Sequence, residues 1–266
     1  MPEKHADVYA VRAASSGGQY NQETTESSMK HHIELDLDFL PPFQGFPKEG
    51  IDFLRRLKKN NTRSWFQEHK MEYEENVKLP MQSLIGALKS KMMTLAPEFE
   101  VNPKRSMFRI YRDIRFSKDK SPYKTHVAAV FHLKGRPWEN SAGFYIHIEP
   151  GEVYAGGGIY MPDGRQLKTI RQTIAGNAKE FLAILSRPSF RRKFSSLEGE
   201  QLRRPPKGFP SDHPMVEWLK YKSYFTGTQL EEKKCHSPRF VDGVISIYSE
   251  LLPLVRFLNH ALERNS

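Results

Sequence analysis

Apolar residues recur at steps of three and four between residues 43 and 97, and this period is typical of helices. The first helix should begin at Pro47, because proline suits a first helical position, and the pair Asn60–Asn61 should end it. Pro80 lies inside a second, longer stripe. Since proline lacks a backbone donor, we expect a kink or two abutting helices there. That stripe consists of Tyr73, Val77, Met81, Leu84, Ile85, Leu88, Met92 and Leu95.

The apolar period changes to two between residues 105 and 161, which predicts strands whose alternate side chains face a core. Phe108 and Ile110 indicate the first strand, with both side chains toward the core. Three further strands follow, and together they predict an antiparallel sheet of about four or five strands. Their apolar residues are Val127, Ala129, Phe131 and Leu133, then Phe144, Ile146 and Ile148, then Val153, Ala155 and Ile159.

Helical stripes return after residue 163, so two helix blocks flank the sheet and the predicted fold class is α+β. Residues 187–210 are rich in proline and arginine and should be irregular, and Pro253 should interrupt a long final helix. Residues 1–42 are polar and have no apolar period, which predicts a disordered acidic tail. We find no linker within residues 43–266, so we expect them to form a single α+β domain.

The chain carries a formal net charge of +10, and this charge is unevenly distributed. The predicted tail holds seven acidic and three basic residues, so the remainder is more basic than the total suggests. Such a body attracts anions, for example nucleic acid, acidic lipid surfaces or phosphorylated metabolites. The alternative is a charge that only keeps the protein in solution, and net charge alone leaves both interpretations open.

Cys235 is the only cysteine, which excludes an intrachain disulfide and a cysteine-based zinc site within one chain. This favours a reducing, cytoplasmic compartment. No apolar run approaches the roughly 20 residues that span a bilayer, so we expect no membrane span. The chain has no phosphate loop of the nucleotide-hydrolase kind, no nucleophile elbow and no dinucleotide fingerprint, so we predict no cofactor. Nothing in the pattern fixes an oligomeric state.

The histidines of the predicted strands do not suggest a metal site. His126 and His132 share one strand face by their spacing, but they lie about 20 Å apart at the rise of a strand, too far to bind one metal. His147 belongs to another strand. We therefore predict no metal site.

The densest group of charges lies at residues 112–124, after the first predicted strand. These residues would form a long cationic connection to the next strand. Arginine forks and lysine charges in such a loop suit phosphate or carboxylate groups. The alternative is that Arg112 and Asp113 pin the loop to the sheet while its lysines stay solvated. The predicted anion-binding residues are Arg109, Arg112, Asp113, Arg115, Lys118, Lys120, Tyr123 and Lys124.

The same loop carries a resemblance to a known family. Its string Arg-Asp-Ile-Arg-Phe-Ser-Lys-Asp-Lys-Ser-Pro-Tyr-Lys, at residues 112–124, is similar to the signature of the domain-of-unknown-function 2461 family. The resemblance extends over about residues 43–264 and implies a single domain. It implies no activity, so no catalytic residue is carried over. Further matching stretches are Gly45-Phe46, Phe53-Leu54, Asn60-Asn61, Trp65-Phe66, Tyr73-Glu74, Gly156-Gly157-Gly158, Leu167 to Arg171, Pro206-Lys207-Gly208 and Leu219-Lys220-Tyr221-Lys222.

A second candidate region is the hairpin closed by Pro150–Gly151. A two-residue turn pairs position 147 with 154 and position 145 with 156, so the face opposite the core is rich in aromatic residues. Glycines in a strand leave a shallow floor that a ligand can approach, and rings beside it can stack on a base or sugar. The alternative is that a helix packs there. The predicted sheet-face pocket consists of Tyr145, His147, Tyr154, Gly156 and Gly158.

A further basic stretch spans Arg187 to Lys207, and Arg171, Lys220 and Lys222 are secondary candidates. If this stretch lies beside the loop at 112–124, the combined surface suits nucleic acid. We therefore expect an anion-binding domain for a phosphate-bearing ligand, either nucleic acid or a nucleotide-like molecule. One alternative is an enzyme of unknown reaction with a pocket at the same loop and the tyrosine-lined face. Another is an interaction protein for an acidic partner.

Overall fold

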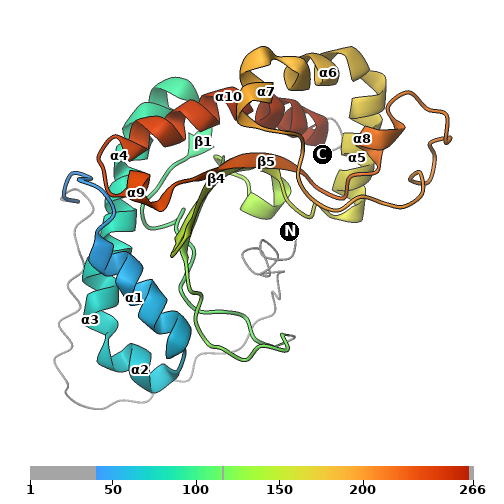
Figure 1. Ribbon diagram of the computed structural model, residues 1–266. Coiled ribbons are helices and arrows are strands. Elements are labelled where there is room, and N and C mark those ends of the chain that lie inside the picture. Colours follow the sequence, from blue (N-terminus) through green and yellow to red (C-terminus); the bar gives the residue numbers. More distant parts are fainter. Residues whose placement is uncertain (1–39, 116, 264–266) are drawn as a thin grey trace.

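The computed structural model describes residues 40–115 and 117–263 (Figure 1). Five antiparallel strands lie in the order β1-β2-β3-β4-β5, with helices before β1, between β4 and β5 and after β5 along the chain, so the predicted α+β fold is confirmed. The predicted acidic tail falls outside the described residues, except for residues 40–42. The strands are β1 (Phe99–Glu100), β2 (Val127–Leu133), β3 (Gly143–Glu149), β4 (Glu152–Ile159) and β5 (Tyr224–Leu230).

The expected disturbance at Pro80 takes the form of a π turn. Pro80 has no N–H for the carbonyl of Asn76 four residues earlier, and the helix widens so that the N–H of Leu79 donates to Glu74. Gly50 packs against this turn so closely that a Cβ on it would lie 2.1 Å from the Asn76 oxygen. The N-terminal block consists of α1 (Lys48–Lys59), α2 (Arg63–Glu68), α3 (Lys70–Tyr73), the π turn η3 (Glu74–Lys78) and α4 (Leu79–Leu95).

The C-terminal block ends in one long helix, α10 (Phe240–Glu263), which continues through Pro253. The predicted interruption is therefore wrong. Leu251, Leu254 and Val255 beside the proline are fully buried, and this packing offsets the missing backbone bond. No helix within the described ranges is long and apolar enough to cross a membrane. The other elements are η4 (Trp138–Asn140), α5 (Gly164–Gly176), α6 (Ala178–Ser186), α7 (Pro188–Lys193), α8 (Val216–Leu219) and α9 (Glu232–Cys235).

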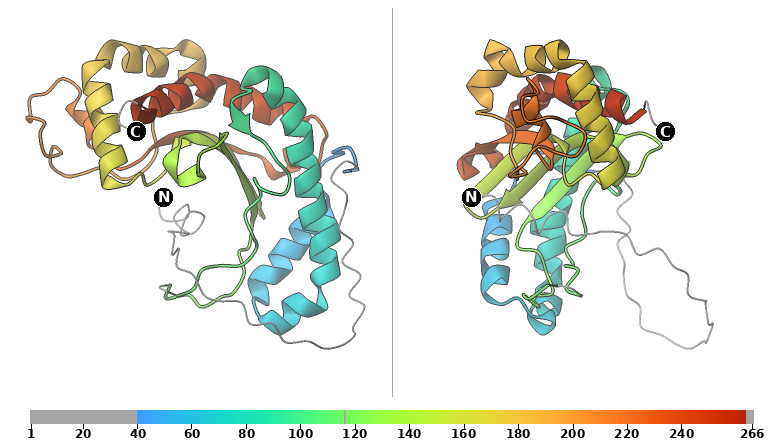
Figure 2. Two further views of the ribbon diagram at one scale, coloured as in Figure 1. Left: turned by 180° about the vertical axis from the view of Figure 1, so that it is seen from behind. Right: turned by 90° about the vertical axis from the view of Figure 1, so that its right-hand side faces the viewer.

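The sheet is curved, and its two faces differ (Figures 1 and 2). Helix α10 lies along the convex face, where Ile146 and Ala155 are buried in the main core. The concave face carries a separate apolar cluster that includes Tyr145 and Tyr154. The register of the hairpin is the predicted one, with His147 opposite Tyr154. The sheet thus has one face that is covered by a helix and another face that carries aromatic side chains.

The segment around Phe108 differs from the prediction. It is not a strand, and it meets β2 only at a bridge between Met107 and Ala129. Ile110 does enter the main core, but Phe108 packs against the cluster on the concave face. Two strands were also missed, β1 because it has only two residues and β5 because its polar centre, Thr226 to Gln229, hides any apolar alternation. In the stretch predicted to be irregular, α7 forms a short helix.

Candidate functional site

The concave face collects polar and aromatic side chains from successive strands. Lys124 and His126 lie just before β2, and His147 lies on β3 opposite Ala128. Because side chains alternate along a strand, these positions share the face that carries Tyr154 of β4. Lys124, His126 and His147 are each less than 9% exposed. The structure thus brings part of the predicted loop and the predicted sheet-face pocket onto one surface.

Aromatic rings form a continuous row across this face. The centroids of the His126 and His147 rings are 5.9 Å apart, and His147 stacks on Tyr154 at 5.7 Å with an interplanar angle of 17°. Tyr145 lies beside both, 5.6 Å from His147 and 6.4 Å from Tyr154. Contacts of this kind hold the rings in place, so the face offers a rigid aromatic floor.

The glycines beneath this row make room for Tyr154. A Cβ on Gly227 would lie 2.4 Å from the Tyr154 ring, and one on Gly156 would lie 2.7 Å from it. The ring therefore lies flat over β4 and β5, and its hydroxyl donates to Oε1 of Glu198 at 3.2 Å. Gly158 has a φ of +134° and allows close approach to the Tyr224 carbonyl. At Gly156 the predicted open floor is thus covered by a ring of the protein itself.

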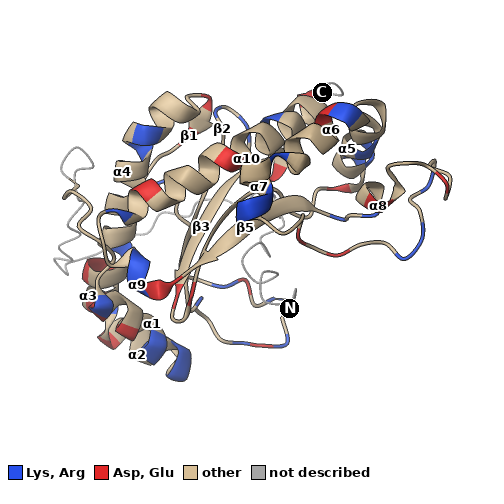
Figure 3. Ribbon diagram, turned by 45° about the horizontal axis from the view of Figure 1, so that its top comes forward, with Lys and Arg blue, Asp and Glu red and all other residues tan. Residues whose placement is uncertain are grey.

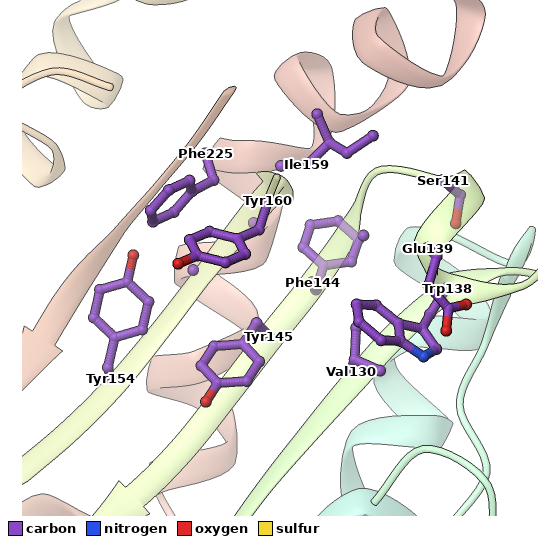
Figure 4. Close-up of a pocket in the computed structure, with 14 residues that line it drawn as sticks. Val130, Trp138, Glu139, Ser141, Phe144, Tyr145, Tyr154, Ile159, Tyr160 and Phe225 are labelled. Atoms are coloured by element: carbon purple, nitrogen blue, oxygen red, sulfur yellow. The ribbon is translucent and has the colours of Figure 1, made fainter. Parts of the chain in front are cut away.

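A shallow pocket opens at one end of the row (Figure 4). Tyr145 and Tyr154 lie side by side on β3 and β4, and Tyr160 lies near Phe225 at 5.3 Å. The empty volume, with the open mouth included, is about 470 Å³. The pocket suits a flat group that rests on the sheet. Its lining residues are Val130, Trp138, Glu139, Ser141, Gly143, Phe144, Tyr145, Tyr154, Gly156, Gly157, Gly158, Ile159, Tyr160 and Phe225.

Lys124 is the most unusual charged residue of the face. It is 6% exposed, and its Nζ has no hydrogen-bond partner among the described residues. The ammonium lies 5.0 Å from the centroid of the Phe108 ring, a cation–π contact that replaces only part of its hydration. Burial, and then the nearby charge of Arg109, lower its pKa from 10.5 to about 8. Among the described residues, Lys124 is therefore a buried cation without a counter-ion.

His126 lies next to this lysine on the same face. Burial first, and then the positive charges of Lys124 and Arg112, lower its pKa from 6.5 to about 4. The imidazole is therefore neutral at pH 7, and its Nε2 has no hydrogen-bond partner within the described part of the chain. Across the row, Nε2 of His147 lies 3.8 Å from a carboxylate oxygen of Glu152.

Most cations of the predicted anion loop bind carboxylate or carbonyl oxygens of the loop itself. Arg115 binds Asp113 with two hydrogen bonds, of 3.0 and 2.7 Å, and this pairing lowers the pKa of Asp113 to about 2. Arg112 pairs with Asp119, whose pKa is lowered first by bonds from Ser121 and then by that of Arg112. These contacts join residues of the loop to one another, whereas the alternative interpretation had Arg112 and Asp113 pin the loop to the sheet.

Three further loop residues were predicted to bind an anion, and their surroundings differ. Lys120 donates to the carbonyl of Ile114 at 2.9 Å, whereas Lys118 is exposed. The ring of Tyr123 is buried and stacks on Phe66 at 4.1 Å, away from solvent. Of the eight predicted anion residues, only Lys124 is both cationic and buried on the concave side, with Arg109 exposed beside it.

The secondary basic candidates have structural partners. Arg171 is buried and donates to the carbonyl of Tyr221 at 3.0 Å. Lys220 pairs with Glu217 at 2.6 Å, and Lys222 pairs with Glu200 at 2.7 Å. Acidic residues also lie among the basic ones along the described helices and loops (Figure 3). Lys220 and Lys222 are therefore each balanced by a carboxylate, and Arg171 is held by the backbone.

The two basic stretches lie at opposite edges of the sheet. Met107, before the loop, bridges to Ala129 on the side of β2 that faces away from β3, where β1 also pairs. Glu198, in the second stretch, bridges to Phe225 on the free side of β5. Strands β3 and β4 separate them, so the condition for one combined basic surface is not met along these two segments.

Several residues of the site were not predicted. Glu198 comes from an irregular segment, and no sequence period connects it with Tyr154. Trp138 and Phe225 belong to η4 and β5, whose sequences show no clear apolar period. His126 was not predicted as part of the sheet-face pocket, although its spacing of two from Lys124 indicates a shared strand face. Among the described residues, no three His, Cys, Asp or Glu side chains gather closely enough to hold a metal.

Comparison with known proteins agrees with the resemblance in the loop. A family model described as a conserved hypothetical protein (DUF2461) matches residues 49–257, which include every strand of the sheet and the basic loop. A search of curated proteins gives no match.

Proposed function

The chain belongs to the DUF2461 family of conserved hypothetical proteins, and because that description carries no activity, we propose a function from the site itself. The concave face binds a small phosphate-bearing ligand. Lys124 and Arg109 attract its anionic group, and its flat part rests on the row formed by Tyr145, His147 and Tyr154. The ligand is nucleotide-like in its chemistry, since it combines an anion with a planar ring.

The observation that carries this proposal is the buried Lys124. Buried charges in proteins are normally paired, because removal of a charge from water costs several kcal/mol. Lys124 has no such partner in the described chain, and the nearby Arg109 adds positive charge. A bound anion would supply the missing counter-charge and would return the pKa of the lysine toward its ordinary value.

The aromatic row supports a planar partner for the same ligand. Rings such as those of Tyr145 and Tyr154 stack on bases with a gain of about 1–3 kcal/mol per base. The pocket beside them is shallow and is lined mainly by aromatic side chains and glycine. A small molecule fits these dimensions better than a nucleic-acid strand, because a strand would need a continuous basic track. Arg112 and Arg115 of the loop are instead paired with carboxylates of the loop itself.

The test compares ligand classes on one protein. Isothermal titration calorimetry would use inorganic phosphate, mononucleotides and a single-stranded oligonucleotide, with wild type, Lys124→Met and the exposed control Lys118→Met. We expect a mononucleotide to bind wild type and Lys118→Met equally, and Lys124→Met to bind it at least about tenfold more weakly, because a charge-assisted contact is lost.

Salt dependence separates the two kinds of ligand. Binding of a small ligand in the site should change little with ionic strength, whereas binding of a strand should fall with a log–log slope of about −0.7 per phosphate contact. Oligonucleotide binding that is steep in salt and equal in Lys124→Met would replace this proposal with a nucleic-acid surface. If the protein binds none of the three ligand classes at low salt, the proposed function is wrong.

A further inference from the structure

The break between α1 and α2 holds three polar residues with different partners. Asn60 ends α1, and its side-chain amide donates to the carbonyl of Arg56 at 3.0 Å. Thr62 begins α2, and its hydroxyl accepts from the backbone N–H of Trp65 at 3.3 Å. The side chain of Asn61 caps neither helix. Its side chain reaches instead to the end of the basic loop, 62 residues along the chain.

Asn61 makes a two-way bond with the backbone of Tyr123. Its Nδ2 donates to the Tyr123 carbonyl at 2.9 Å, and its Oδ1 accepts from the Tyr123 N–H at 3.0 Å. The side-chain amide thus pairs with both backbone groups of Tyr123, as the backbone of a neighbouring strand would. Asn259 uses the same device at the other helix block, where it binds both backbone groups of Ala142 at 2.9 and 3.0 Å. The fold therefore fastens both helix blocks to the strand region by an asparagine amide.

Tyr123 is the residue through which the stem of the loop is held. It bridges to Tyr111 across the stem, and its ring stacks on Phe66 of α2. The next residue is Lys124, whose N–H donates to the carbonyl of Ile110 at 2.8 Å. The position of the lysine ammonium under Phe108 therefore depends on a backbone that Asn61 fixes from the helix block.

We propose that Asn61 is a positioning residue of the anion site, which holds the backbone at Tyr123 and thereby keeps Lys124 buried on the concave face. This inference rests on the proposed function. Without the clamp the stem gains freedom, and Lys124 moves toward water. Its ammonium is then hydrated, and its pKa rises from about 8 toward the ordinary value of 10.5. The anionic ligand loses a preorganised partner and must order the stem itself.

The test uses Asn61→Ala beside the matched control Asn60→Ala, which removes a side-chain amide one residue away that bonds only within α1. The pKa of Lys124 is measured by NMR titration of the lysine side-chain resonances, and binding is measured with inorganic phosphate and a mononucleotide. We expect Asn61→Ala to raise the pKa of Lys124 and to weaken binding about tenfold, since two hydrogen bonds are lost. Asn60→Ala should change neither.

A residue with a merely structural role would lower the melting temperature without changing the titration of Lys124. An unchanged pKa of Lys124 in folded Asn61→Ala therefore overturns the proposal. If Asn61→Ala does not fold, Asn61→Leu replaces it, because leucine has a similar volume, removes both hydrogen bonds and adds no charge that would itself raise the pKa of Lys124. The pKa of Lys124 should then rise as expected for Asn61→Ala, and no rise would again count against the clamp. If wild type binds neither probe while Asn61→Ala still raises the pKa, the proposed function fails and the clamp on Lys124 stands.

Discussion

The two faces of the sheet are buried to the same degree but by different means. On the convex face Ile146 is fully buried against apolar side chains, while on the concave face its neighbour His147 is 3% exposed among polar and aromatic groups. Helix α10 covers the first face, and its Tyr248 hydroxyl also donates to the carbonyl of Tyr145 at 3.2 Å. The convex face therefore provides stability, whereas the concave face holds groups such as Lys124 whose burial reduces stability.

The largest effect is expected on the convex side. Leu251 of α10 is fully buried in the main core, and Leu251→Ala leaves a cavity there. We expect a loss of about 2–5 kcal/mol in the free energy of unfolding. Urea denaturation at pH 7 measures it. A loss below about 1 kcal/mol would contradict the view that this face carries the stability.

The opposite sign is expected for Lys124 on the concave face. At pH 7 the lysine is protonated in both states, and its burial disfavours the folded state. Lys124→Met should therefore raise the free energy of unfolding by up to about 3 kcal/mol. Because the folded pKa, about 8, is below the unfolded value of 10.5, wild-type stability should rise with pH between them and the variant should lack this rise. Denaturation of both proteins from pH 7 to 10.5 measures the difference, and a destabilised variant would refute it.

His126 should make the concave face sensitive to acid. Its folded pKa, about 4, lies below the unfolded value of 6.5, so the unfolded state binds the proton first and stability falls as pH falls from 6.5 to 4. The penalty is about 2 kcal/mol at pH 5. His126→Phe should lose that much less stability than wild type between pH 7 and 5, as measured by thermal denaturation. Parallel curves would show that His126 is solvated in the folded protein.

The smallest effect is expected for the exposed lysine of the loop. Lys118 lies in the same basic segment as Lys124 but in water. Lys118→Met should change the free energy of unfolding by less than about 0.5 kcal/mol, with no change in its pH dependence. A change as large as that of Lys124→Met would show that burial is not what distinguishes the two lysines.

The same comparison shows what the sequence could predict. The alternation of Phe144 to Ile148 and the turn at Pro150–Gly151 determined the register and both faces of the hairpin, because side-chain direction follows parity in a strand. Strand β5 was not predictable, since its centre is polar and Gly227 is required only by the ring that lies over it. The interruption predicted at Pro253 was wrong, because α10 is stabilised by packing against residues distant in sequence, which the local effect of a proline does not take into account.

The candidate site was predictable in part and for a physical reason. The charge of the loop at 112–124 was visible, but which cations would be neutralised depends on folded contacts such as those of Arg115 with Asp113 and Arg112 with Asp119. The burial of Lys124 follows from the position of Phe108, which faces the side of the sheet opposite to the predicted one. Composition can indicate that a segment is cationic, but only the fold decides which of its charges remains available.

The π turn at residues 74–78 has a consequence for how chain length can vary among relatives. A π turn accommodates one residue more than the regular helix, so a relative with a single deletion there would form an ordinary α-helical turn and keep the apolar sides of both flanking helices in place. A single deletion within α4 would instead rotate every later residue by about 100° and turn Leu84 and Leu88 away from the core. We expect one-residue gaps in an alignment of this block to gather at the π turn, provided that position 80 is not proline in the shorter chains.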